Sequence, residues 1–239
     1  MQPALFDVPS SAPSRSLPLS PLPYSWDLTP DDAVVVQQEL SARVWTMNGF
    51  DPEAVTTVAG IGVSLKGEGQ AAVVVLSFPD LRPLDRAVAT AKLTFPYVPG
   101  LLSFRESPLV LAAFEKLTVA PDVLLVDGQG YAHPRRFGVA CHLGVLLDRP
   151  AVGVAKSILV GRYENLGDQP GDQAPVIHRG EVVGAAVRTK PRTNPLIVSV
   201  GHKIDLPTAI AFVLRCVRGY RLPEPTRAAH NLAGSAEAA

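Results

Sequence analysis

The chain has 239 residues, 47% of them hydrophobic and 18% charged, and its net charge is zero. This composition is typical of a globular protein, so it excludes a chain that is mainly disordered, and the zero net charge argues against a protein that coats polyanions over its whole surface. One domain with a sizeable core is the leading expectation for this length, although two small domains would also fit.

Cysteine usage and hydropathy indicate the compartment. The two cysteines, Cys141 and Cys216, cannot build a disulfide framework, which favours a reducing environment. No run approaches the roughly 18 apolar residues that span a bilayer, and the N-terminus lacks a basic segment followed by an apolar one. We therefore expect a cytoplasmic protein without a membrane partner. A monomer is expected as well, because no heptad or large apolar stripe stands out.

The first part of the chain predicts a tail, a helix and an antiparallel meander. Residues 1–23 are rich in proline and serine and are expected to form a flexible tail. Thr29 can cap a helix that starts at Pro30 and runs to about Trp45. Three apolar runs with short connections then favour antiparallel strands. These runs are residues 56–65, 71–78 and 84–95.

A rigid loop and a second helix come next. Two prolines flank Tyr97 and fix the backbone around it, so this aromatic side chain stands on a stiff support. A helix is predicted over residues 103–117. It places Glu106 in the first turn, where the helix dipole favours a carboxylate, and Pro108 near the start, where proline is tolerated.

A buried strand that ends at Asp127 is the central feature. Four consecutive apolar residues, 123–126, predict a strand buried on both faces, and the Gly-Gln-Gly after Asp127 stops it. In α/β sheets, ligands bind at the carboxyl ends of the strands. Asp127 is therefore a candidate functional carboxylate, although Asp-Gly is also a common turn dipeptide.

The second half predicts a parallel unit followed by a hairpin. A helix at 136–148 and a buried strand at 151–155 complete a parallel β-α-β unit with the central strand. The further expected elements are a loop at 161–173, a hairpin at 176–189, a strand at 195–200 with a turn at His202, and helices at 206–217 and from 224. We therefore predict an α/β fold with a mixed β-sheet flanked by helices. It forms a single domain over residues 24–231, with a second tail at 232–239.

The polar residues favour a hard cation. Asp127, Glu106 and the histidines His133, His202 and His230 form an oxygen-rich set without thiolates, which suits Mg²⁺ or Mn²⁺ better than zinc. The sequence contains no Gly-x-Ser-x-Gly elbow, P-loop or complete dinucleotide glycine fingerprint, which weakens the hydrolase and nucleotide-cofactor classes that use them.

A basic excess follows the central strand. Residues 1–120 carry 8 basic and 12 acidic residues, whereas residues 121–239 carry 14 and 10. Both a local phosphate-binding face and an ordinary solvated surface are compatible with this excess. The candidates for such a face are Arg135, Arg136, Lys156, Arg188, Lys190, Arg192, Lys203, Arg215, Arg218, Arg221 and Arg227.

Six separated motifs lie in order along the chain. They are Phe95-Pro96-Tyr97-Val98-Pro99-Gly100-Leu101-Leu102-Ser103-Phe104-Arg105-Glu106, Asp127-Gly128-Gln129-Gly130 with Ala132-His133-Pro134-Arg135, Gly153-Val154-Ala155-Lys156-Ser157, Arg188-Thr189-Lys190, Gly201-His202, and Glu224-Pro225-Thr226-Arg227 with His230. Together they resemble the endonuclease V family over roughly residues 30–231.

The resemblance implies a ribonuclease H-like fold and a DNA-repair nuclease for deaminated purines, chiefly hypoxanthine in deoxyinosine. Such enzymes nick the second phosphodiester bond on the 3′ side of the lesion with Mg²⁺, for which Mn²⁺ is a substitute. Related proteins prefer inosine in RNA. The implied partner is therefore damaged DNA or inosine-containing RNA.

The resemblance also implies roles for single residues. Asp127 and Glu106 would bind the metal, and Lys156 and His230 would lie near the scissile phosphate, so these four are the implied catalytic residues. Tyr97 would be the wedge that fills the space left by the extruded base. The implied lining of the base pocket is Gly100, Leu102, Gly128, Gly130, His133 and Leu159.

One position departs from the family pattern. The first strand of the family ordinarily carries a metal-binding aspartate, but this chain reads Ala59-Gly60-Ile61-Gly62-Val63-Ser64 and has Gly62 in that place. Glycine cannot bind a metal, and Glu68 lies too far along the strand to substitute. We expect the fold and lesion recognition to be retained, and nicking to be severely reduced or absent.

Two other functions remain open at this stage. A non-catalytic protein that binds inosine-containing DNA or RNA through the same pocket would tolerate Gly62, whereas the intact Glu106, Asp127, Lys156 and His230 favour an enzyme lineage. A soluble α/β domain of unrelated function is the other alternative.

Overall fold

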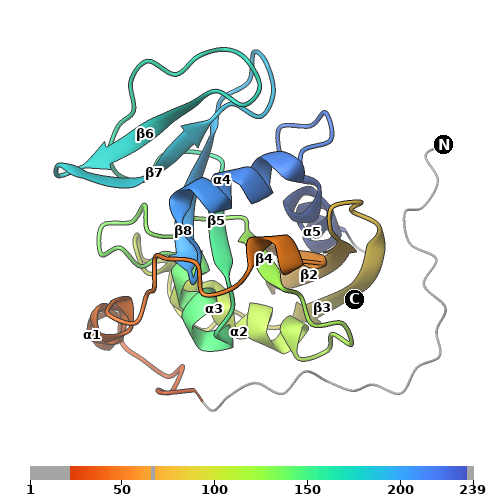
Figure 1. Ribbon diagram of the computed structural model, residues 1–239. Helices are drawn as coiled ribbons and strands as arrows, with labels where there is room; N and C mark the ends of the chain where they lie inside the picture. The colour runs from red at the N-terminus through yellow and green to blue at the C-terminus, as the bar shows by residue number, and fades with distance from the viewer. Residues whose placement is uncertain (1–21, 66–67, 236–239) are drawn as a thin grey trace.

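An eight-stranded mixed sheet forms the centre of the molecule, in a computed structural model that describes residues 22–65 and 68–235 (Figure 1). Its strand order is β3-β2-β1-β4-β5-β8-β7-β6. The strands are β1 (Thr57–Ser64), β2 (Gln70–Ser77), β3 (Pro83–Thr90), β4 (Val123–Val126), β5 (Ala151–Ala155), β6 (Gln173–His178), β7 (Glu181–Val187) and β8 (Leu196–His202). The helices are α1 (Pro30–Ser41), the short 3₁₀ helix η1 (Pro52–Ala54), α2 (Leu102–Phe114), α3 (Val139–Leu147), α4 (Leu206–Arg215) and α5 (Glu224–Gly234).

The pairing confirms the predicted mixed sheet. Strands β1, β2 and β3 form an antiparallel meander, and β4 and β5 are parallel to each other and joined through α3. Strand β1 runs parallel to β4, while β8 runs antiparallel to β5. The carboxyl ends of β1, β4 and β5 therefore meet at one edge of the sheet.

Helices cover both faces of the sheet because its central strands are apolar on both sides. All four residues of β4 are buried, and alternate side chains point to opposite faces. Val123 and Leu125 belong to the cluster with α4 and α5, whereas Leu124 and Val126 belong to the cluster with α2 and α3. Asp127, two residues after Leu125, continues on the α5 side.

Several predicted boundaries were wrong, each for a tertiary reason. Helix α1 ends at Ser41 rather than near Trp45, because Trp45 pairs with the end of β8: its N–H donates to Nδ1 of His202 at 3.2 Å, and its carbonyl accepts from the N–H of Lys203. His202 itself closes β8 instead of lying in a turn. Strand β3 ends at Thr90, well before residue 95.

Helix α2 begins at residue 102, so Glu106 is its fifth residue and Pro108 its seventh. Glu106 is thus a buried residue of the helix body and not a first-turn carboxylate. Pro108 lies inside the helix, with its side chain half-buried. Glu106 is therefore held by packing, with little help from the helix dipole.

The last helix is longer than expected. Helix α5 continues to Gly234, so the prediction of a tail from residue 232 is wrong for residues 232–234. Ala233 is buried, and Gln70 of β2 donates to the Leu232 carbonyl at 3.1 Å, so the sheet holds this final turn. The predicted tail covers residues 1–23, and residues 1–21 of it lie outside the described residues. Among the described residues, none of the helices has the length and apolar character needed to cross a membrane.

Candidate active site

Asp127 stands at the carboxyl end of β4, directly beside Gly62 of β1. The parallel ladder pairs Ile61 with Val126, and the N–H of Asp127 donates to the Ile61 carbonyl at 2.9 Å. Gly62 and Asp127 are thus the next neighbours in register. A side chain at position 62 would point to the same face of the sheet as Asp127.

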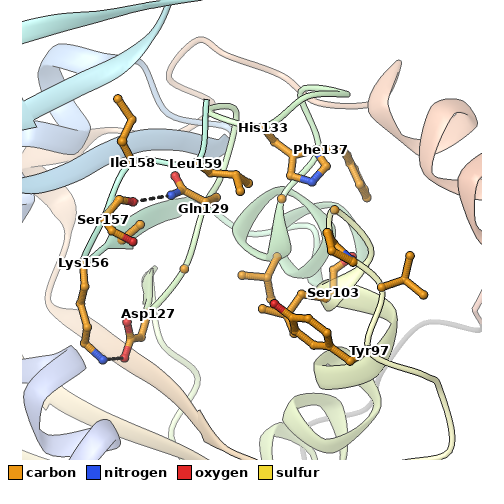
Figure 2. Close-up of a pocket in the computed structure, with 18 residues that line it drawn as sticks. Tyr97, Ser103, Asp127, Gln129, His133, Phe137, Lys156, Ser157, Ile158 and Leu159 are labelled. Atoms are coloured by element: carbon orange, nitrogen blue, oxygen red, sulfur yellow. Dashed lines mark hydrogen bonds and ion pairs between the residues drawn. The ribbon is translucent and has the colours of Figure 1, made fainter. Parts of the chain in front are cut away.

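A lysine from the neighbouring strand neutralises Asp127. Lys156 follows β5, and its Nζ donates to Oδ2 of Asp127 at 2.5 Å (Figure 2). His230 of α5 completes the group, with Nδ1 3.5 Å from the same oxygen and 3.4 Å from Nζ of Lys156. Because Lys156 and His230 are partly exposed, a phosphate from solvent can reach them.

Glu106 faces this group from α2 and is 8% exposed. Burial raises the pKa of its carboxyl to about 8, the negative charge of Asp127 adds to the rise, and the nearby Arg105 opposes it. At neutral pH Glu106 therefore carries its proton. A protonated carboxyl is a poor metal ligand until the proton leaves.

Helix α5 packs directly over the glycines of β1. A Cβ atom built on Gly62 would lie 3.1 Å from the backbone nitrogen of His230 and 3.2 Å from the carbonyl carbon of Ala229. On Gly60 it would lie 1.8 Å from the Pro225 carbonyl oxygen, so the backbone of α5 would have to move away from the sheet. Position 62 would therefore accept a side chain only after α5 shifts by a few tenths of an ångström.

The carboxylates present do not complete a divalent-cation site. Within the described residues, no three His, Cys, Asp or Glu side chains gather in a way that could hold a metal ion. Asp127 and Glu106 are neighbours, but one is paired with Lys156 and the other is protonated. Oxygen ligands of the right type are present, in too small a number and with too little negative charge for Mg²⁺.

A cavity of about 300 Å³ opens beside Asp127. That volume lies at the lower end of pockets that bind small ligands. Figure 2 shows Asp127 and Lys156 at one end and Tyr97 across the cavity from them. Tyr97 is 68% exposed, so its ring is available for stacking. The predicted site residues that line the cavity are Tyr97, Gly100, Leu102, Asp127, Gly128, His133, Lys156 and Leu159.

Gly130 does not belong to the lining, although it was predicted there. A Cβ on Gly130 would lie 2.2 Å from the carbonyl oxygen of Val200 in β8, and its N–H donates to Oγ of Ser199 at 2.9 Å. Glycine is required at this position by the close approach of β8. Glu106 and His230 also lie outside the lining and reach the site through Asp127.

His133 presents a neutral ring to the cavity. Burial lowers its pKa to about 4, and the positive charge of Arg135 contributes. Its Nδ1 accepts a hydrogen bond from the backbone N–H of Arg135 at 3.2 Å. With Nδ1 as acceptor, the proton of the neutral ring lies on Nε2.

Sequence reasoning missed several lining residues. Gln129 crosses one wall and donates from Nε2 to the Ser157 carbonyl at 2.8 Å (Figure 2). Oε1 of Gln129 and Oγ of Ser103 are buried and have no hydrogen-bond partner within the described residues. The remaining missed residues of the lining are Val98, Pro99, Phe137, Gly138, Val139, Ala155, Ser157 and Ile158. Many of them lie in the quoted motifs, but no local pattern shows which way they point.

The basic residues do not form one free face. Many are tied to partners within the protein: Arg136 pairs with Glu181, Lys203 with Asp148 and Arg227 with Glu224. Arg221 donates to the carbonyls of residues 156, 194 and 195. Much of the positive charge in the second half is therefore engaged in contacts within the protein.

Comparison with known proteins gives a consistent family. The family model for endonuclease V matches residues 38–231. An endonuclease V of Trichormus variabilis is 52% identical over 216 residues, which cover 89% of this chain and 97% of that protein.

Solved structures agree with this match and confirm the expected ribonuclease H-like fold. The endonuclease V of Streptomyces avermitilis superposes with a TM-score of 0.83 at 42% identity and covers 89% of this chain and 94% of its own. A Ciona intestinalis endonuclease V, solved in complex with a DNA containing an inosine followed by a ribo-adenosine, superposes with a TM-score of 0.74 at 31% identity. It covers 86% of this chain and 97% of its own.

Proposed function

The chain belongs to the endonuclease V family of nucleases, and from this premise we propose that it recognises a deaminated purine, chiefly hypoxanthine in deoxyinosine, within DNA. The cavity beside Asp127 is the observation that carries the proposal. It combines an apolar lining and an exposed aromatic ring, which suit a base, with the neighbouring charged pair Lys156–Asp127, where a phosphate can bind to the lysine. The Ciona relative was solved with inosine-containing DNA, which supports the same class of ligand here.

Recognition requires the damaged base to leave the helix. Unstacking a base costs a few kcal/mol, and least for a mismatched one, so a group that fills the gap lowers the cost. Tyr97 at the rim can stack in that gap, since a base and an aromatic ring stack with about 1–3 kcal/mol. The extruded base then enters the cavity, where the unpartnered Ser103 Oγ and Gln129 Oε1 offer a donor and an acceptor to its polar edge.

Lys156 and His230 are positioned to hold the backbone next to the base. Both lie at the Asp127 end of the cavity and are partly exposed. A phosphate that approaches Lys156 can replace Asp127 as the ion-pair partner of the lysine, and His230 can donate a hydrogen bond to a phosphate oxygen. We assign the bond beside these two residues as the second one 3′ of the lesion, by the family resemblance.

We propose that this chain hydrolyses the phosphodiester bond beside Lys156 and His230 only very slowly. The family reaction uses Mg²⁺ to stabilise the charge on the phosphate and to activate water. In this chain Gly62 stands beside Asp127 where the resemblance places a third carboxylate, and the remaining set does not suit the ion. A second candidate function follows from the same observation: a protein that binds inosine-containing DNA or RNA without cutting it.

The test is nicking of an end-labelled oligonucleotide with one deoxyinosine, in Mg²⁺ or Mn²⁺, by the natural chain and by Gly62→Asp. We expect Gly62→Asp to cut roughly 100-fold faster or more, at the second bond 3′ of inosine, because it returns a charge-stabilising ligand. Gly62→Ala is the matched control, since it adds the same Cβ beside α5 without a carboxylate.

The outcomes separate the candidates. If only Gly62→Asp cuts, the nuclease lineage and the role of position 62 are both supported. Equal cutting by both chains would show that another group completes the site and would sink the argument from Gly62. Lesion-dependent binding by the natural chain without cutting selects the binding function, and no binding of inosine by either chain overturns both candidates.

A further inference from the structure

Gln37 of α1 is a fully buried amide that bonds to two residues of the cavity lining, Gly100 and Phe137, and to Arg135. It is 0% exposed, and it lies outside the motifs of the sequence analysis. Its Nε2 donates to the Gly100 carbonyl at 3.0 Å and to the Phe137 carbonyl at 2.8 Å. Its Oε1 accepts from Nε of Arg135. Burying an amide is costly unless it is hydrogen-bonded, and here the bonds go to two separate loops.

Arg135 closes the same arrangement from the second loop. Its Nη2 donates to the Gly100 carbonyl at 2.8 Å, so that one oxygen accepts from both Gln37 and Arg135. Its backbone N–H donates to His133. Gly100 has φ of +81°, a conformation that favours glycine, and a Cβ there would lie 2.9 Å from Nη2 of Arg135.

The two bridged loops form adjoining walls of the cavity, since a Cβ on Gly100 would lie 3.7 Å from Nε2 of His133. One wall carries Tyr97 and Gly100, and the other carries His133 and Phe137. Gln37 lies behind both walls, and its hydrogen bonds to Gly100 and Phe137 hold them at a fixed separation. A cavity of about 300 Å³ has little room to spare, so a shift of one wall against the other would change the space that a ligand can fill.

Holding α1 in place does not require these polar bonds. Ala33 of α1 is buried in a cluster with Phe95, Leu101 and Phe104, and Leu40 is buried with Phe137 and Cys141. Apolar packing at both ends of the helix already docks it. The hydrogen bonds of Gln37 are therefore not needed to dock the helix, and they must serve another purpose.

We propose that Gln37 and Arg135 are specificity-determining positioning residues, which fix the separation of the Gly100 and Phe137 walls and thereby admit hypoxanthine while excluding guanine. This inference rests on the proposed base-binding function of the cavity. Guanine differs from hypoxanthine by one exocyclic amine at C2, a group that a rigid cavity excludes and a loosened one admits.

The experiment measures the affinities of fluorescein-labelled oligonucleotides that carry either deoxyinosine or deoxyguanosine at one position. Fluorescence anisotropy is recorded in Mg²⁺, and a gel verifies that the strand stays intact. The variants are Gln37→Leu, which removes all three hydrogen bonds at similar size, and Arg135→Lys, which keeps the charge but loses the planar fork. Gln38→Leu is the matched control, because Gln38 is an exposed neighbour on the same helix.

The ratio of the two dissociation constants is the deciding quantity, because misfolded protein weakens both apparent affinities equally and leaves their ratio unchanged. We expect Gln37→Leu and Arg135→Lys to lower the inosine preference on the order of tenfold, and Gln38→Leu to keep it. Gln37→Leu takes a donor from the Gly100 and Phe137 carbonyls, and Arg135→Lys takes one from the Gly100 carbonyl and one from Oε1 of Gln37. A preference that stays at the natural value in both variants overturns the positioning role. If the natural chain itself shows no inosine preference, the proposed function fails first and the positioning role with it.

Discussion

At the scale of single residues, charge balance around Asp127 decides the chemistry. Lys156 neutralises Asp127 and burial keeps Glu106 protonated, so the group as it stands is nearly neutral. A divalent cation needs several negative oxygen ligands, and position 62 is where the next one would stand. The proposed loss of hydrolysis thus rests on the glycine at this position, which is not among the residues that line the cavity.

The protonated Glu106 makes stability depend on pH. Its pKa is about 8 in the folded chain and 4.5 in the reference state, so between these values folding takes up one proton. Stability therefore falls by about 1.4 kcal/mol per pH unit as the pH rises from 4.5 toward 8, and the loss is complete above the folded value. Glu106→Gln carries no such proton and should remove this slope.

Urea unfolding at several pH values, with a chelator present, measures the effect. Glu106→Gln is expected to gain stability over the natural chain with rising pH. Glu115→Gln is the matched control, because Glu115 is the exposed C-cap residue of the same helix. Parallel pH profiles for the natural chain and Glu106→Gln would show that Glu106 is ionised at neutral pH.

At the scale of elements, helix α5 packs closely against β1 and thereby limits the space at position 62 beside Asp127. Gly60 and Gly62 point to the same face of β1, and the backbone of α5 lies against both. The same helix carries His230, so its distance from the sheet also sets the position of that ring beside Asp127. Close packing of a helix on glycines is a local requirement with a functional consequence.

A pair of alanine variants tests this packing. Gly60→Ala places a methyl group 1.8 Å from a backbone oxygen, whereas Gly62→Ala makes its nearest contact at 3.1 Å. We expect Gly60→Ala to lower the free energy of unfolding by about 3 kcal/mol and Gly62→Ala by about 1 kcal/mol. Chemical denaturation compares the two variants directly. Equal losses would show that α5 does not pack more closely on Gly60 than on Gly62.

At the scale of the whole molecule, strand order brings distant parts of the sequence together. Strands β1, β4 and β5 are adjacent and parallel, so residues 62, 127 and 156 meet at one edge, and α2 and α5 bring Glu106 and His230 to it. A ligand that binds this edge therefore stabilises the complete fold.

The effect of Mg²⁺ on the melting temperature tests whether a ligand at this edge stabilises the fold. Millimolar Mg²⁺ is expected to leave the melting temperature of the natural chain unchanged and to raise that of Gly62→Asp by a few degrees, because only the variant offers enough negative oxygen ligands. A chelator should reverse the rise. The prediction fails if Mg²⁺ stabilises both chains to the same extent.

The sequence by itself determined the helices and strands of the core, the strand that ends at Asp127, and the departure at Gly62. The elements and the strand end follow from local signals, namely apolar periodicity and turn glycines, whereas the departure at Gly62 follows from the resemblance of the motifs to a family. The mixed sheet was therefore predictable, and the resemblance to a family implied eight of the 18 residues that line the cavity.

Only the tertiary structure decided how these pieces act on one another. The proton on Glu106 depends on burial beside Asp127, the glycine at 130 on the approach of β8, and the wall separation on Gln37, which lies 63 residues from Gly100 and 98 from Arg135. The end of α1 was likewise fixed by the pairing of Trp45 with β8. Such contacts join residues far apart in the chain, and the energies of burial and pairing that they create have no local signature in the sequence.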